Sequence, residues 1–189
     1  MSLIYQRDPL TDSEILVAIN TSRKAKEKAF NYLVSTYQEP IYWHIRKLVL
    51  LHEDANDVTQ NCFIKAYKGI KNFKGKSSIK TWLFSIAYNE SMNFLNKKKR
   101  RLRLSDESYN DQLLNELQED VYFSGDEIEL KFQKALLELP PQQKSIFLMR
   151  YHEEIKFKDI AQILHKSEGA IKASYHIATK KLKHYLNNL

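Results

Sequence analysis

The sequence predicts an all-α protein: two small helical domains joined by an acidic linker, with a helix-turn-helix in the C-terminal domain. Glycine and proline each occur only four times in 189 residues, so turns are few. Long stretches rich in Leu, Ile, Lys, Glu and Gln favour helices over a sandwich or a barrel. Hydrophobic residues make up 43% of the chain, which is enough to bury a core.

The charge of +7 is distributed in three blocks. Residues 1–103 carry 19 Lys or Arg against 9 Asp or Glu, and residues 131–189 carry 11 against 5. Residues 104–130 hold 9 carboxylates and neither Lys nor Arg. We therefore place the domains at 1–103 and 128–189 and the linker at 104–127. Two basic blocks suggest a polyanionic partner, although composition alone leaves a solvated basic surface equally open.

Cysteine content and hydropathy exclude several protein classes. Cys62 is the single cysteine, so neither a disulfide framework nor a multi-cysteine zinc site is possible within the chain. We interpret it as a small buried apolar residue. No run approaches ~18 apolar residues, and Met1–Pro9 has no leader pattern. The sequence thus predicts a soluble cytoplasmic protein without direct membrane insertion.

Four helices are expected in the first domain. Thr11 and Glu14 have capping-box spacing, which predicts that a helix begins near Thr11. An apolar stripe predicts a second helix over about 27–51, which Pro40 should kink or break. Two further helices are expected at about 54–70 and 79–103.

The linker and the second domain follow the same logic. Within the acidic segment we expect at most one short helix, around 113–117. The second domain should contain helices at about 128–139, 142–151 and 157–164, and a last helix from 168 almost to the end. Pro140 and Pro141 separate the first two of these, and Ser167 suits the N-cap of the last.

The last two helices have the pattern of a helix-turn-helix. The first presents Ile160, Ala161 and Leu164 inward, and a short turn follows it. The last helix has polar residues opposite its apolar stripe, a face that suits the DNA major groove: Lys172, Ser174, His176, Thr179 and Lys180. The pattern also fits an αα-hairpin inside a helical bundle.

A second candidate nucleic-acid surface lies in the first domain. Aromatic, small polar and cationic residues alternate there: Phe73, Lys74, Lys76, Ser77, Ser78, Lys80, Thr81 and Trp82. Asn89, Asn93 and Asn96 share one helix face, and six cations follow at 97–103. Aromatic rings stack on unpaired bases and cations track the backbone, which favours single-strand binding. The alternative is that Phe73 and Trp82 belong to the core.

Three polar residues and one aromatic residue recur every three positions on the helix at 54–70: Asp54, Asp57, Gln60 and Phe63. Carboxylates near a helix start suit its dipole, whereas the functional interpretation is a docking surface for a protein. A metal-dependent nuclease is disfavoured, because no His joins the two carboxylates at ligand spacing and no third carboxylate follows on that face. No Gly-rich phosphate loop or Ser/His/Asp motif occurs, so we expect no catalytic residue, metal or cofactor.

Four strings together resemble the extracytoplasmic-function (ECF) family of bacterial RNA polymerase sigma factors. They are the residues 54–67, the residues 73–83, the run Ile86-Ala87-Tyr88-Asn89 with the cations after Leu95, and the residues 139–182. The resemblance extends from about Thr11 to Leu186. It implies a protein that brings core RNA polymerase to promoters.

The resemblance also implies roles for individual residues. Core polymerase would bind Asp54, Asp57, Gln60 and Phe63 through the coiled coil of its largest subunit, and the flap of its second-largest subunit is a further expected contact. The minus-10 element would contact the residues Phe73, Lys74, Lys76, Ser77, Ser78, Lys80, Thr81, Trp82, Asn89, Asn93, Lys97 and Arg100. The minus-35 element would contact Ser167, Glu168, Gly169, Ala170, Lys172, Ser174, His176, Thr179 and Lys180. Many members are also held by an anti-sigma factor.

Some positions depart from the family pattern. Asn56 and Asn61 stand where members often carry Glu, and Ser174 and Ile177 stand where Arg is frequent. The alternatives are a helix-turn-helix regulator that never joins the polymerase and a purely structural helical protein. The string Phe73–Trp82 counts against the first, and the cations at 97–103 count against the second.

Overall fold

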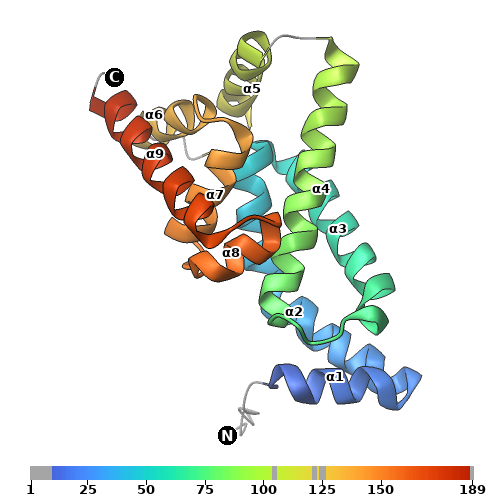
Figure 1. The fold of residues 1–189 in the computed structure, drawn as a ribbon. Helices are drawn as coiled ribbons and strands as arrows, with labels where there is room; N and C mark the ends of the chain where they lie inside the picture. Colours follow the sequence, from blue (N-terminus) through green and yellow to red (C-terminus); the bar gives the residue numbers. More distant parts are fainter. Residues whose placement is uncertain (1–9, 104–105, 121–122, 124–126, 188–189) are drawn as a thin grey trace, which may run out of the picture.

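The computed structural model describes residues 10–103, 106–120, 123 and 127–187. Every regular element within these ranges is a helix, which confirms the predicted all-α class (Figure 1). Expectations about Met1–Pro9 and about the linker positions 104–105, 121–122 and 124–126 lie outside the described residues.

The first domain consists of four α-helices and one short turn of 3-10 helix. They are α1 (Asp12–Thr21), α2 (Arg23–Val49), α3 (His52–Gly69), η1 (Ile70–Asn72) and α4 (Ile79–Leu102). The capping box of α1 is present: the Glu14 amide donates to Thr11 Oγ1, and the Thr11 amide donates to the Glu14 carboxylate. Ser22 and Ser78 cap α2 and α4 more simply, since each side chain accepts from the backbone amide three residues on. Short polar residues before apolar stripes therefore set three of the helix starts.

Pro40 does not break helix α2, which runs for 27 residues with the proline inside it. A proline within a helix costs about 3 kcal/mol, since one backbone hydrogen bond is lost and the ring crowds the preceding turn. Leu33, Ile41 and Ile45 on the two sides of Pro40 are all fully buried. Each buried side chain contributes roughly 1.5–3 kcal/mol, so continuous packing outweighs the proline.

The core of the first domain lies between α2, α3 and α4. Its fully buried side chains include Leu33, Ile45, Ala55, Ala66, Leu83 and Phe84. Cys62 belongs to this core, as predicted, and burial raises the pKa of its thiol to about 12. Apolar residues spaced about four apart give each helix one apolar face. These faces meet at the centre of a three-helix bundle, and α1 packs across it.

The acidic segment forms a longer helix than expected, α5 (Asp106–Glu119). Tyr109, Leu113 and Leu117 follow one another at four-residue spacing, and all three are buried. The many carboxylates led us to expect a linker here, so the apolar stripe was interpreted as only a short helix, around 113–117. Beyond α5, Asp120 accepts hydrogen bonds from Arg46 and from the amide of His52, each at 2.9 Å. These contacts fasten the described end of the linker to the first domain.

The second domain contains α6 (Glu127–Leu137), α7 (Pro141–Tyr151), α8 (Phe157–Leu164) and α9 (Glu168–Asn187). Pro141 occupies the first turn of α7, as expected of a proline that lacks the amide hydrogen. The predicted apolar stripe of α9 is buried at Ile171, Ala178 and Leu182, but Leu186 is 41% exposed. The stripe therefore ends one turn before the helix does.

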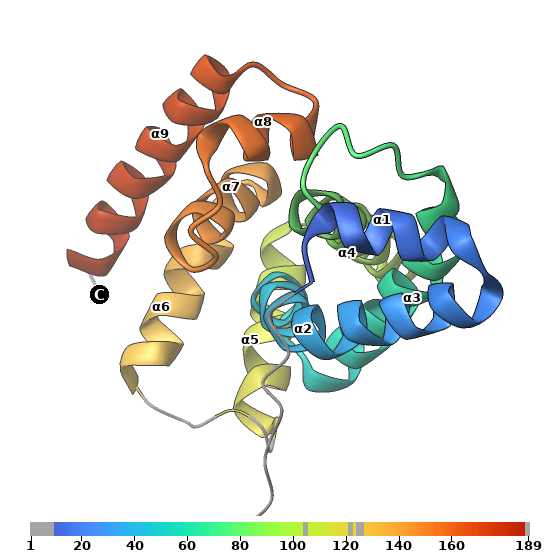
Figure 2. The ribbon, with the colours of Figure 1, turned by 90° about the horizontal axis from the view of Figure 1, so that it is seen from below.

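The two domains pack against each other, with α8 on α4 and α7 on α2 (Figures 1 and 2). Lys80 Nζ on α4 donates to the carbonyl of Glu153, after α7, at 3.1 Å. Lys144 on α7 is buried and points its Nζ at the carbonyl of Leu48, in the last turn of α2, at 3.4 Å. The structure thus joins the two basic blocks in one packed arrangement.

Candidate nucleic-acid and partner interfaces

The C-terminal pair α8 and α9 forms a helix-turn-helix. Helix α8 buries Ile160, Ala161 and Leu164 as predicted, together with Ile163. The chain then turns through His165, whose backbone is left-handed at φ 52°, ψ 45°. Ser167 accepts a hydrogen bond from the amide of Ala170 at 3.2 Å and so starts α9. A tight turn and a capped second helix fix the crossing of the two helices.

The recognition face of α9 comprises the nine residues expected to contact duplex DNA. Seven of them are exposed: Ser167, Glu168, Gly169, Ala170, Lys172, His176 and Lys180. The remaining two, Ser174 and Thr179, are half-buried, and the Thr179 hydroxyl donates to the carbonyl of Tyr175. Lys172 Nζ lies 2.6 Å from the carboxylate of Glu168. Because both side chains are about half exposed, this pair is weak and leaves the ammonium available to a phosphate.

The segment 73–82 turns from η1 into α4 and carries two aromatic rings. Phe73 and Trp82 lie with ring centroids 5.1 Å apart and planes tilted by 34°. Both residues are half-buried and pack against the edge of the core, so each keeps part of its surface accessible to solvent. Lys74 and Lys76 between them are exposed. Phe73 and Trp82 therefore belong partly to the core and are partly available to a ligand at the surface.

Three side chains predicted to contact the minus-10 strand are engaged within the protein. Ser78 Oγ accepts from the amide of Thr81 at 3.0 Å and lies 2.8 Å from the Thr81 hydroxyl. Thr81 is buried by this arrangement. Lys80 is bound to the Glu153 carbonyl. These three groups start α4 and hold the domain contact in this structure, and Ser77 beside them is half-buried.

The outer face of α4 carries the predicted amides and cations. Asn89, Asn93, Lys97 and Arg100 are all exposed. Near the end of the helix a shallow cavity of 550 Å³ is lined by Asn96, Lys99, Arg100 and Arg103. Lys98 differs from its neighbours, because its ammonium lies 2.6 Å from Asp54 and 3.6 Å from Glu116. Polar and cationic groups thus continue from the segment 73–82 along one side of α4.

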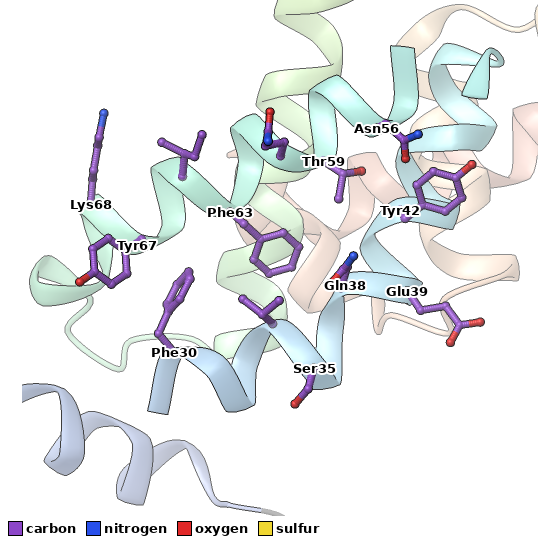
Figure 3. Close-up of a pocket in the computed structure, with 13 residues that line it drawn as sticks. Phe30, Ser35, Gln38, Glu39, Tyr42, Asn56, Thr59, Phe63, Tyr67 and Lys68 are labelled. Carbon is purple, nitrogen blue, oxygen red and sulfur yellow. The ribbon is translucent and has the colours of Figure 1, made fainter. Parts of the chain in front are cut away.

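A groove of 870 Å³ runs between α2 and α3, and we call it the partner groove (Figure 3). Its lining residues are Phe30, Val34, Ser35, Gln38, Glu39, Tyr42, Asn56, Thr59, Gln60, Phe63, Ile64, Tyr67 and Lys68. Of the four predicted docking residues, Gln60 and Phe63 line it, and Asp57 is exposed on the same helix outside the groove. Asp54 is turned away and paired with Lys98.

Sequence reasoning missed most of the groove. Phe30 meets Tyr67 edge to face, with ring centroids 5.0 Å apart, and Lys26 Nζ lies 4.0 Å from the Tyr67 ring centroid. Thr59 Oγ1 is buried in the lining, and it has no hydrogen-bond partner within the described part of the chain. Thr59, Phe63 and Tyr67 lie four residues apart, beside the stripe that fills the core. The sequence does contain a signal for the groove: the apolar face of this helix is wider than the stripe that fills the core, so some of its apolar residues must lie outside the core.

Comparison with known proteins identifies the family. Residues 33–101 match the family model Sigma-70 region 2, and residues 129–182 match the model Sigma-70, region 4. The ECF RNA polymerase sigma-E factor of Escherichia coli (strain K12) is 30% identical over 175 residues, which cover 88% of this chain and 89% of that protein. The chain belongs to the ECF sigma factors. The RNA polymerase sigma factor YlaC of Bacillus subtilis is 31% identical over 149 residues, 78% of this chain and 85% of that protein.

Solved structures agree with the fold of this sigma factor. RpoE from Bartonella quintana, solved in complex with the anti-sigma factor NepR, has a TM-score of 0.66 at 21% identity and covers 85% of this chain and 98% of that one. CnrH, solved with the cytosolic domain of CnrY, has a TM-score of 0.69 at 17% identity and covers 94% of this chain and 97% of that one. At these identities the likeness supports the fold alone.

Family membership decides between the alternatives left open by the sequence. This ECF sigma factor is a transcription initiation factor that acts with RNA polymerase on promoters, and a regulator that never joins the polymerase is not favoured.

In the part of the chain that the structure describes, no helix combines the length and apolarity needed to cross a bilayer. Likewise, no three potential metal ligands gather among those residues.

Proposed function

We propose that residues 1–103 bind core polymerase and the minus-10 element, that 104–127 link the domains, and that 128–189 read the minus-35 element. The partner groove carries the first assignment, because it is open, apolar and flanked by the exposed carboxylate of Asp57. Gln60 and Phe63 lie in it where a helix of the largest subunit's coiled coil would pack. Phe30, Val34 and Ile64 add apolar surface to the same lining, which suits the apolar face of such a helix.

The minus-10 strand would bind across the segment 73–82 and the outer face of α4. The exposed parts of Phe73 and Trp82 would supply stacking, and Asn89 and Asn93 would supply amides for base edges. Extruding a base costs a few kcal/mol, whereas stacking on an aromatic side chain returns about 1–3 kcal/mol per base. Two rings and the following cations therefore suffice for capture without ATP. Lys97 and Arg100 would then follow the backbone.

The minus-35 element would lie against the recognition face of α9. The bare backbone around Gly169 suits a close phosphate contact, and Lys172 and Lys180 suit phosphates further along the helix. His176, exposed between them, would face a base edge. This domain would also contact the flap of the second-largest polymerase subunit.

Both elements can be bound at once only if the domains separate. The names of the elements place them about 25 base pairs apart, and at about 3.4 Å per pair this is about 85 Å of duplex. A compact chain of this length has a radius of gyration of about 16 Å. In the packed arrangement α8 lies on α4, so core polymerase would have to draw the domains apart.

Further assignments follow from the relatives. RpoE was solved with the anti-sigma factor NepR, which supports a regulatory partner of this class for the present chain. We place the protein in the cytoplasm, where polymerase and promoters are, and assign it no catalytic activity of its own.

Run-off transcription tests the assignment directly. Core polymerase from a suitable bacterium is mixed with the purified chain and a random promoter library, and the transcripts are sequenced. We expect start sites that share an upstream and a downstream element and that vanish without the chain. Start sites that do not depend on the chain would overturn the proposed function.

The docking surface is tested by replacing Asp57 and Gln60 together with Ala. The exposed carboxylate and the groove-lining amide are lost, so we expect co-purification with core polymerase to fall at least tenfold while the fold is kept. The matched control replaces Glu27 and Asn31 with Ala, because these remove the same two groups from α2 outside the groove. A stable complex with the first variant, or equal losses in both, would contradict this docking face.

A further inference from the structure

Helix α1 holds the segment that is to read the minus-10 strand, although it lies before the residues that match the family model, 33–101. Asp12 Oδ2 accepts a hydrogen bond from the backbone amide of Ile79, the first residue of α4, at 2.9 Å. Leu16 reaches the loop before α4: its Cδ1 lies 3.1 Å from where a Cβ on Gly75 would be. Two successive turns of α1 thus contact the middle of the loop, at Gly75, and the residue that follows it, Ile79.

The helix is itself firmly anchored, as a brace must be. Ile15 and Ile19 are 2% and 4% exposed and pack toward α2. Its first turn is closed by the capping box of Thr11 and Glu14. Val17 faces solvent at 67% exposure. One face of α1 is therefore fixed to the bundle, and a neighbouring face meets the loop.

The Asp12 contact satisfies a need that Ser78 leaves open. The first amides of a helix have no partner inside it, and Ser78 takes up only the amide of Thr81. Asp12 takes up the amide of Ile79, and its negative charge also suits the positive end of the helix dipole. The carboxylate so fixes where α4 begins.

The Leu16 contact fixes the other part of the loop. Gly75 adopts φ +67°, a left-handed conformation that suits glycine, so the loop bends sharply there. Leu16 lies against this bend, close enough that a Cβ on residue 75 would be 3.1 Å from its Cδ1. Lys74 and Lys76, on the two sides of Gly75, are exposed, so the conformation of this bend sets where their backbone lies on the surface.

We propose that Asp12 and Leu16 are positioning residues for capture of the minus-10 single strand. They would touch no DNA themselves but would hold the loop 73–78 and the start of α4 in the binding geometry before the strand arrives. The inference rests on the proposed function of that segment. It adds α1 to the surface that reads the promoter.

The test uses holoenzyme assembled from core polymerase and the full chain. The probe is a fork-junction fragment of a promoter selected by run-off transcription, single-stranded through the minus-10 element. Loss of a capping side chain destabilises a helix start by about 1 kcal/mol, which corresponds to about fivefold in affinity. We therefore expect Asp12→Ala to lower the affinity of the holoenzyme for the fork about fivefold. Asp12→Asn keeps an acceptor oxygen and should recover most of the affinity. Leu16→Ala should lose affinity as well.

Three controls separate positioning from general damage. Val17→Ala, on the solvent face of α1, should bind the fork like wild type. Association with core polymerase, and binding of a duplex that carries only the minus-35 element, should be unchanged in all variants. Leu16→Ala leaves the Asp12 bond in place, so it decides the matter if Asp12→Ala does not fold.

The outcomes are distinct. If wild-type holoenzyme binds the fork and both Asp12→Ala and Leu16→Ala bind it equally well, the inference is wrong. Equal losses on the fork and on the minus-35 duplex would overturn it as well, since that pattern means a damaged fold. If wild-type holoenzyme binds no fork of any selected promoter, the proposed function itself fails.

Discussion

Gly169 lies in the first turn of α9, where the chain gives no packing reason for a glycine. A Cβ built at this position meets nothing within 4 Å. Its neighbours Glu168 and Ala170 are exposed as well. A glycine in a helix costs roughly 0.5–1 kcal/mol relative to alanine, so its presence calls for an explanation outside the free chain. Close approach of a phosphate to the helix amides supplies one.

Replacing Gly169 with Ala should therefore separate stability from function. We expect the free energy of unfolding to rise by about 0.5–1 kcal/mol, because the unfolded chain loses conformational freedom. Affinity for the minus-35 duplex should fall about fivefold, a loss of about 1 kcal/mol in binding free energy, as the new methyl group keeps the phosphate away. Urea unfolding and duplex binding measure the two effects.

Gly69→Ala is the matched control, because Gly69 lies on α3 and a Cβ there would touch Trp82 at an ordinary 3.6 Å. It should leave the minus-35 affinity unchanged. If Gly169→Ala binds the duplex as tightly as wild type, the explanation by close phosphate contact fails.

Single helices were predictable where the signal is local. A capping residue and an apolar stripe belong to neighbouring residues, and so the starts at Thr11 and Ser167 were found in advance. The break that was one of the two outcomes expected at Pro40 does not occur, because the cost of the proline is local but its compensation comes from packing against α3 and α4. The linker helix was underestimated because acidic composition outweighed the stripe of Tyr109, Leu113 and Leu117. Tertiary packing overrode local preference in both cases.

Helix α9 carries a prediction of its own, concerning its charge. Lys172 and Lys180 are both exposed on the recognition face. If each neutralises one phosphate, replacing both with Ala should reduce the slope of log affinity against log salt by about 0.9 for each contact. Binding of the minus-35 duplex at several salt concentrations gives this slope. Lys134→Ala, an exposed cation on α6, should leave it unchanged, and an unchanged slope in the double variant would refute the proposed orientation of α9.

The interfaces depend on the whole molecule, and sequence reasoning predicted them less fully. The amides and cations of α4 and the outer face of α9 could be predicted, because each belongs to one helix. The partner groove needs α2 and α3 side by side, and so only its α3 residues Gln60 and Phe63 were found. That Lys80 binds Glu153 and Asp54 binds Lys98 was not visible at all, since each pair joins distant segments.

The contact between the domains carries an unusual buried cation. Lys144 is 5% exposed, and its ammonium has the Leu48 carbonyl at 3.4 Å as a hydrogen-bond acceptor. Burial lowers the pKa of Lys144 to about 7, whereas in the unfolded chain it has its ordinary value of 10.5. The contact between the domains therefore includes the free-energy cost of removing the Lys144 amine from water. This weakens the packed arrangement near neutral pH, which suits the proposed separation of the domains on core polymerase.

Lys144→Met should expose this cost as a pH dependence. Between about pH 7 and 10.5 the unfolded chain holds a proton on Lys144 that the folded chain has given up, so wild-type stability rises with pH across that window. Methionine fills similar volume without the amine, so the variant should be more stable than wild type at pH 7. The difference in the free energy of unfolding between the variant and wild type should then narrow by about 2 kcal/mol by pH 9. This follows because the free energy of unfolding of wild type rises by at most about 1.4 kcal/mol per pH unit. Urea unfolding at the two pH values measures the gap, with Lys134→Met on the exposed face of α6 as the control that should follow wild type. A gap that stays constant would mean that Lys144 is already solvated, and hence that the two domains do not pack in solution as they do here.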